Sequence, residues 1–485
     1  MNVMRINSKL ILFFSPFSVV YAEAQTTSTP NVILIMADDL GWGDVGFNGN
    51  SRIKTPCLDK LASEGVLFEQ FYSAAPLSSP TRASVLTGRN AYRMGVFAPN
   101  VGILRPEEKT LPELLKEKGY STGHFGKWHL GTLTYKEADA NRGRPENRHL
   151  FNPPAEHGYG DAFVTESKVP TFDPMSAPPT NNGRFWDYLS EYGERKEYGT
   201  FYWDVDGNKV TEGLKGDDSR IIIDRTIPFI DNSLKQGKPF LATVWFHTPH
   251  LPCVAGPEYA AMYQELSLEE RNYYGCITAM DDQIERLIRF LKQKGIYEET
   301  VIFFCSDNGP EINTPGTAAS FKGKKRSLHE GGIRVPAFMT GGKYQLAKRI
   351  SQSCCTSDYL PTILDMTGMT DVVPYNLDGE SFLSFIGSGT SARKKPIVFC
   401  SGSQGAVVAG DYKLYYNKGR CELYDLAKDP SEENDISFSH PVEVKRLFDY
   451  LVGEMSAYRS SFEGGEYGKK SVKRMNQVWE DIFSE

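Results

Sequence analysis

Short apolar runs alternate with helical spacing of apolar residues along much of the chain. The runs 31–36, 240–246 and 300–305 have strand length and almost no charge, and 121–125 indicates a fourth strand. Such runs are typical of strands covered on both faces. Residues 277–291 place their apolar side chains on one helix face, and 55–64 indicates a shorter helix. The alternation predicts an α/β fold with a large, mostly parallel or mixed sheet flanked by helices.

The pattern divides the chain further. Residues 136–236 are rich in Pro, Gly, Asn and aromatic residues, so we expect loops and short elements over one end of the sheet. Residues 387–395 have the composition of a linker, and strand-like runs at 406–409 and 413–416 precede a helical stretch at 441–458. We therefore expect a signal peptide at 1–22, a large α/β domain at 27–386 and a small α+β domain at 395–485.

The first 22 residues have the order of a secretory signal. Arg5 and Lys9 precede a mostly apolar run that ends in Val20-Tyr21-Ala22. The run is too short to span a bilayer, and a buried first strand or helix is the alternative interpretation. The pattern predicts an exported protein that does not span a membrane.

Composition excludes some partners. The 485 residues carry a net charge of −7 with acids and bases interspersed, so nothing resembles the basic stripe of a nucleic-acid-binding protein. None of the eight cysteines has a metal-type CxxC spacing, and their spacing does not specify any disulfide.

Hard oxygen ligands follow two of the predicted strands. Asp38 and Asp39 come directly after the first strand, and Asp307 and Asn308 come after a later one. In a parallel sheet both pairs would lie at the carboxyl ends of strands, where such folds bind ligands. Their oxygens suit calcium or magnesium and are poor for zinc. Turn chemistry alone is the alternative for either pair taken singly.

A serine and several basic residues complete the candidate chemistry. Ser78 lies at or just before a predicted helix start, with Arg82 one turn later; as a plain serine it is more typical of an N-cap than of a nucleophile. Bases in the segments 123–131, 246–252 and 321–332 are Lys127, His129, His250 and Lys325. A surface lysine or a loop histidine is the ordinary alternative for each. Together with an acidic metal site, they suit an anionic substrate whose charge is neutralised during transfer.

An ordered set of motifs resembles the formylglycine-dependent sulfatases of the alkaline-phosphatase-like superfamily. In that family Cys or Ser, any residue, Pro, a small residue and Arg are followed by a TGR segment. Here the corresponding segments are SSPTR at 78–82 and LTGR at 86–89. The other similar blocks are NVILIMADDLGWGD, GYSTGHFGKWHLG, FHTPHLP, SDNGPE, EGGIRVP and CELYDLAKDPSEEND. The resemblance runs from about Pro30 to beyond Asn434.

The resemblance implies a role for each matching position. Ser78 would be converted to formylglycine (3-oxoalanine). The implied calcium ligands are Asp38, Asp39, Asp307, Asn308 and the modified residue 78. The implied contacts of the formylglycine hydrate are Arg82, Lys127 and His129. His250 would lie beside the leaving group and Lys325 would bind sulfate, although the adjacent Lys324 leaves a one-residue ambiguity. His247 matches less well and would support the loop.

Serine at position 78, where many relatives have cysteine, is the form that the family shows in bacteria. It implies a serine-type radical sulfatase-maturating enzyme as partner. Export and serine-type maturation together predict a bacterial periplasm or cell surface. Thr81 departs mildly from the usual Ser or Ala.

Sulfated carbohydrate is the expected substrate. Trp186, Tyr188, Tyr202 and Trp203 are candidates for stacking on a sugar, although such aromatic residues are at least as often packing residues. Two other functions compete: a phosphatase or phosphodiesterase of the wider superfamily, and a sulfated-glycan-binding protein without activity.

Overall fold

The computed structural model describes residues 29–179, 183–187, 194–369, 372–388, 392–467 and 477–484. The predicted signal peptide, 1–22, lies outside the described residues. Among the described residues, no helix combines the length and the apolar character needed to cross a membrane.

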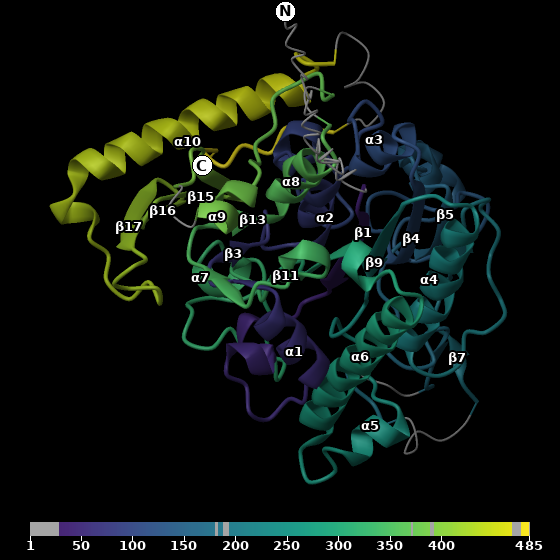
Figure 1. Ribbon diagram of the computed structural model, residues 1–485. Coiled ribbons are helices and arrows are strands. Elements are labelled where there is room, and N and C mark those ends of the chain that lie inside the picture. The colour runs from purple at the N-terminus through teal and green to yellow at the C-terminus, as the bar shows by residue number, and fades with distance from the viewer. Residues whose placement is uncertain are drawn as a thin grey trace, which may run out of the picture.

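A nine-stranded mixed sheet forms the centre of the larger part of the molecule (Figure 1). Its middle strands run parallel in the order β10, β1, β9, β4 and β5. Their bounds are Thr300–Ser306, Asn31–Ala37, Phe240–Trp245, Ser121–Lys127 and Asp161–Thr165. The outer strands are β8 (Trp203–Asp204), β11 (Phe338–Thr340), β2 (Val66–Phe68) and β12 (Lys348–Ile350). The predicted fold class is confirmed.

Helices cover both faces of this sheet, as the apolar strands require. In β1, Ile33 and Ile35 point to one apolar core, and Val32, Leu34 and Met36 point to the other. The first face is covered by α1 (Pro56–Glu64), α4 (Asp218–Lys235) and α6 (Leu268–Gln293). The second is covered by α2 (Ser78–Thr87), α3 (Leu111–Glu117), α8 (Tyr359–Met366) and α9 (Leu383–Ser388).

Residues 136–236 contain more regular structure than their composition predicts. They include β5 of the main sheet and α4, an 18-residue helix that Asp217 caps through the Arg220 N–H. Interior Pro228 obscures the helical pattern, but burial of Ile222 and Phe229 against the sheet holds the helix. Tertiary packing thus overrides a weak local signal.

Short elements join these layers. They are β3 (Phe71–Tyr72), β6 (Ser176–Ala177), β7 (Lys196–Glu197), β13 (Cys354–Cys355), α5 (Pro257–Ala261) and α7 (Glu330–Ile333). The 3-10 turns are Trp42–Asp44, Gly46–Asn48, Ala91–Met94, Pro145–Leu150, Pro154–His157, Tyr297–Glu299, Gly342–Tyr344, Thr356–Asp358 and Ser437–Ser439.

A four-stranded antiparallel sheet follows near the C-terminus. Its strands are β14 (Ile397–Ser401), β15 (Gln404–Ala409), β16 (Tyr412–Asn417) and β17 (Arg420–Asp425). Helix α10 (Pro441–Phe462), yellow in Figure 1, lies along this sheet and buries Leu447, Leu451 and Met455. The expected sheet-plus-helix unit is therefore present. The exact boundary stays a prediction, because linker residues 389–391 lie outside the described residues.

A buried ionic network joins the two sheets. Lys413 on β16 lies 2.8 Å from Glu330 Oε1 and 3.0 Å from Glu432 Oε1, and all three side chains are buried. The second oxygen of Glu432, Oε2, accepts the backbone N–H of Glu330, which begins α7, at 2.6 Å. The network fixes the small sheet against the loop that leads into α7.

We expect Lys413→Met to lower the free energy of unfolding by about 3 kcal/mol, because it removes the cation that two buried carboxylates share. Among the described residues, Glu330 then keeps only Arg334, and Glu432 keeps only His329, as a basic partner. Lys445→Met is the control, since Lys445 pairs with Asp449 on the exposed face of α10, and its effect should stay below about 0.5 kcal/mol. Urea denaturation of the full chain measures both. Equal small changes in the two variants would contradict the role of the network.

Candidate active site

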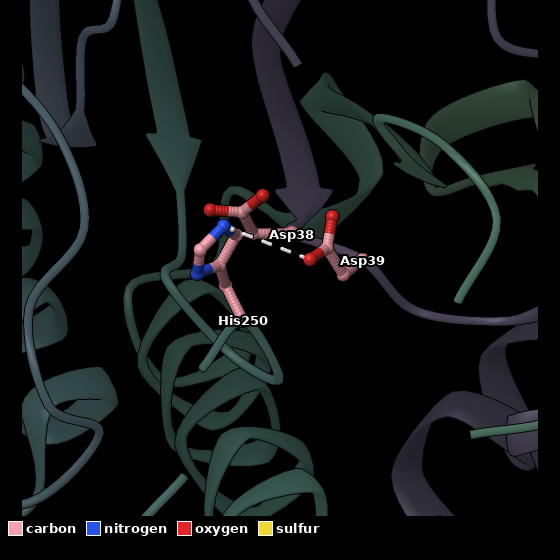
Figure 2. A group of neighbouring side chains, drawn as sticks. All are labelled: Asp38, Asp39 and His250. Carbon is pink, nitrogen blue, oxygen red and sulfur yellow. Dashed lines mark ion pairs between the residues drawn. The ribbon is translucent and has the colours of Figure 1, made fainter. Parts of the chain in front are cut away.

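Two neighbouring parallel strands deliver four oxygen-bearing side chains to one point. Asp38 and Asp39 follow β1, and Asp307 and Asn308 follow β10; all four are buried. Asn308 Nδ2 donates to Asp39 Oδ1 at 2.7 Å, and the Asp39 N–H donates to Asp307 Oδ1 at 3.0 Å. Asp39 has a φ of 67°, a left-handed conformation that turns the chain sharply at the strand end. Figure 2 shows both aspartates at this end of β1, facing His250.

Ser78 joins this group from the first turn of α2. Its Oγ lies 3.2 Å from Asp38 Oδ1, 3.4 Å from Asn308 Oδ1 and 3.5 Å from Lys127 Nζ. Ser78 is 1% exposed. Hydrogen bonds therefore join the five predicted metal ligands into one group, although they come from three separate segments of the chain.

Three cations neutralise the carboxylates. Arg82 Nη2, one turn after Ser78, donates to Asp307 Oδ2 at 2.8 Å. Lys127 Nζ donates to Asp38 Oδ2 at 2.6 Å, and Lys325 Nζ donates to Asp39 Oδ2 at 2.7 Å. The residue before Lys127 is glycine because a Cβ there would lie 1.9 Å from the Trp245 carbonyl oxygen.

The three cations do not stabilise all three carboxylates equally. Burial raises the pKa of Asp38, but Lys127 and other cations more than reverse this and hold it well below its usual range. Burial and the neighbouring charge of Asp38 raise the pKa of Asp307 to about 7, despite the bond from Arg82. A divalent cation would stabilise the ionised form of all three carboxylates. Hard oxygen donors that include a carboxylate with a raised pKa fit a calcium-type ion.

Two histidines, His129 and His250, line the same cavity as Ser78. His250 Nδ1 lies 2.6 Å from the Leu251 carbonyl oxygen, which accepts its proton, so Nε2 points to Asp39 at 3.7 Å. Burial lowers the pKa of His250 to about 4. His129 has a φ of 58°, and neither of its buried ring nitrogens has a hydrogen-bond partner. Burial and the charge of Lys127 hold the pKa of His129 well below its usual range.

His247 does not line this cavity. Its Nδ1 is 2.8 Å from Asp218 Oδ2, and its Nε2 is 2.7 Å from Thr165 Oγ1. It links the start of α4 to the end of β5, which agrees with the supporting role expected for it.

A cavity of about 750 Å³ opens above Ser78. Sequence reasoning missed several of its lining residues, namely Asn100, Asn141, Ser167, Lys168, Glu311, Arg326, residues 401–404 and Glu480. Gln404 in β15 holds the loop that carries Lys325: its Nε2 donates to the Arg326 carbonyl at 2.9 Å, and its Oε1 accepts the Leu328 N–H at 3.0 Å. No local motif marks these residues, since they meet only through folding.

For three of the four aromatic candidates the structure favours packing over stacking on a sugar. Trp186, Tyr202 and Trp203 are 2%, 0% and 4% exposed, and Tyr202 stacks on Phe163 at 4.0 Å. They are packing residues, because their rings fill space between the loops and the sheet. Tyr188 lies outside the described residues.

Residues 30–369 match the family model described as Sulfatase. The chain belongs to the sulfatase family. N-acetylgalactosamine-6-sulfatase of Mus musculus is 30% identical over 427 residues, which cover 84% of this chain and 75% of that protein. Sulfatases are sulfuric ester hydrolases, and the family generally uses formylglycine and a metal ion.

Solved structures agree with this assignment. The structure of Ps i-CgsB in complex with k-i-k-neocarrahexaose is 27% identical, has a TM-score of 0.74, and matches 91% of this chain and 94% of its own. The phosphonate monoester hydrolase of Agrobacterium radiobacter is 20% identical with a TM-score of 0.63, covering 88% and 96%. The second likeness shows a shared fold alone.

Lys325, and not Lys324, reaches the active site. Lys324 Nζ donates to the Gly316 carbonyl at 2.8 Å, away from the carboxylates. We expect Lys325→Ala to lower kcat/KM for sulfate ester hydrolysis by about a hundredfold or more, because it removes a buried cation beside the anion. Lys324→Ala should change it less than about threefold. Sulfate release measured by ion chromatography distinguishes them, and the opposite ranking would contradict this geometry.

Proposed function

We propose that this sulfatase hydrolyses sulfate esters of carbohydrates, with residue 78 as formylglycine and a calcium ion beside it. The observation that carries the proposal is that Ser78 contacts Asp38, Asn308 and Lys127 in the lining of one cavity. Arg82 lies 3.7 Å from the same Asp38 carboxylate. The hydroxyl of a plain serine in that position donates to Asp38, whose pKa is held well below its usual range. So weak a base does not activate a serine, which therefore needs modification to serve as a nucleophile.

The metal would be held by Asp38, Asp39, Asp307, Asn308 and residue 78. When bound, calcium would supply positive charge beside the sulfate oxygens. Oxygen donors select calcium or magnesium over zinc. His250, which also lies near Asp38 and Asp39, is assigned to the leaving group because its Nε2 lines the cavity.

Formylglycine at residue 78 would supply a hydrated aldehyde, a nucleophile that a plain serine lacks. Its formation from serine removes two hydrogens, and we assign this oxidation to a serine-type radical sulfatase-maturating enzyme. Ser at position 78 of the family motif supports that assignment.

The chain's own cations prepare the sulfate for attack. Lys127 and Lys325 flank the cavity floor, where they offset negative charge that develops on sulfate oxygens. Arg82 holds Asp307 and so keeps that carboxylate in place for the metal. His129 offers two unpartnered ring nitrogens, which suit a hydroxyl on residue 78.

His250 would donate a proton to the departing alcohol. The bond from Nδ1 to the Leu251 carbonyl orients the ring, which leaves Nε2 to exchange the proton. Its low resting pKa makes it neutral at neutral pH. A bound anionic sulfate would raise that pKa, so protonation accompanies substrate binding.

Sulfated carbohydrate is the substrate class that we infer. The mouse relative is named for a sulfated amino sugar, and the Ps i-CgsB structure holds a neocarrahexaose. The cavity of about 750 Å³ has room for a sugar and many polar lining residues. We also place the protein in the bacterial periplasm or at the cell surface, because residues 1–22 have the order of an export signal.

The test of the nucleophile is the mass of the tryptic peptide that carries residue 78. Protein coexpressed with a serine-type maturating enzyme should lose two hydrogens from this residue, because oxidation converts the alcohol to an aldehyde. Ser78→Ala should show no loss, and Ser79→Ala should retain it. An unmodified Ser78 in protein that cleaves phosphate esters would overturn the proposal in favour of a phosphatase.

The metal is tested through stability. After chelation, Ca2+ at a hundred times its Kd should raise the free energy of unfolding by about 2.7 kcal/mol, because only the folded chain assembles the ligands. Asp307→Asn should abolish most of this gain, whereas Asp59→Asn, outside the site, should keep it. Denaturation curves with and without Ca2+ measure the difference; no gain in wild type would refute calcium binding.

A further inference from the structure

The charges that line the cavity are unequally paired. The lining includes the cations Lys127, Lys168, Lys325 and Arg326 and the carboxylates Glu311 and Glu480. Lys127 and Lys325 have aspartate partners, and Arg326 Nη1 lies 2.5 Å from Glu311 Oε1. Glu480 Oε1 accepts the Gly402 N–H and the Tyr92 hydroxyl. Lys168 remains as the cation without a carboxylate.

Lys168 is half-buried, three residues beyond the end of β5. Its ammonium makes no hydrogen bond and no ion pair with any residue that the structure describes. Burial and the charge of Lys325 lower its pKa, although Asp39, Asp38 and Glu311 act in the opposite direction. The ammonium is thus partly removed from water and has no direct counter-ion among the described residues. Lysines on a solvated surface rarely meet this constraint, so the cavity wall holds a cation that is ready for an external anion.

Neutral polar groups line the same cavity as this lysine. Asn141 Nδ2 donates to Ser167 Oγ at 3.1 Å and lies 3.4 Å from Asn100 Oδ1. All three residues line the same cavity. Amides and hydroxyls of this kind suit sugar hydroxyl groups. The wall that carries Lys168 therefore combines one free cation with groups suited to a sugar ring.

We propose that Lys168 binds a second anionic substituent of the substrate, a sulfate or a carboxylate, carried near the sulfate that is cleaved. The preferred substrates are then multiply anionic sugars. This inference rests on the proposed function. Lys127 and Lys325 already serve the cleaved sulfate at the cavity floor, and the second anion satisfies the remaining cation of the wall.

The test uses the full-length, matured enzyme and three sugars that share the cleaved sulfate. One has no other charge, one has a second sulfate, and one is linked to a uronic acid. Lys168→Met should lower kcat/KM by about tenfold to a hundredfold on the sugar that carries the recognised anion, mainly through KM. On the singly charged sugar the change should stay below about threefold.

Two control variants separate charge from structure. Lys168→Arg keeps the positive charge and should recover most of the lost kcat/KM. Lys136→Met removes an exposed lysine outside the cavity and should leave all three sugars unaffected. The sugar whose turnover falls most on Lys168→Met identifies the second group as sulfate or carboxylate.

The outcomes separate this inference from the proposed function. Equal loss on all three sugars, or no loss on any, would overturn the role of Lys168 while leaving the sulfatase reaction intact. Absence of sulfate release from every sugar by the matured wild type would overturn carbohydrate as the substrate class, and this inference with it.

Discussion

Mutual compensation of buried charges is the interaction on which the whole site depends. Asp38, Asp39 and Asp307 are almost completely excluded from water, where an isolated carboxylate is strongly destabilised. Lys127 and Arg82 offset part of that cost through direct contacts. Burying these charges costs folding free energy. The same buried charges favour the binding of a cation and of an anionic substrate.

The fold meets this requirement by geometry. Parallel strands β1 and β10 end side by side, so residues about 270 positions apart come within hydrogen-bond distance. Helix α2 adds Ser78 from a third segment. The small C-terminal sheet then contributes Gln404, which holds the loop of Lys325. Both sheets therefore contribute to one site. The buried ion pairs of Lys413 with Glu330 and Glu432 hold the small sheet in place against the larger part of the molecule.

The elements that the sequence predicted well are those whose signal is local. The strand at 31–36 and the helix at 277–291 are specified by an unbroken apolar run and by helical spacing, and both are present. The strand is one residue longer, whereas the helix begins nine residues earlier, at Leu268. Helix α4 was not predicted, because Pro228 weakens its pattern and packing against the sheet supplies the missing stability. The burial of Trp186 also depends on tertiary packing, so the sequence could not assign this residue to the surface or to the core.

The sequence by itself determined the chemistry: acidic pairs after strands, a serine in a family motif, and basic residues in characteristic blocks. Tertiary structure alone decided which groups meet. It brought Lys325, and not Lys324, to the carboxylates. It also paired His247 with Asp218 and left Lys168 in the cavity lining without a partner among the described residues. The physical reason is that contact distances between remote residues depend on how strands and helices pack, and a pattern along the chain carries no such distance.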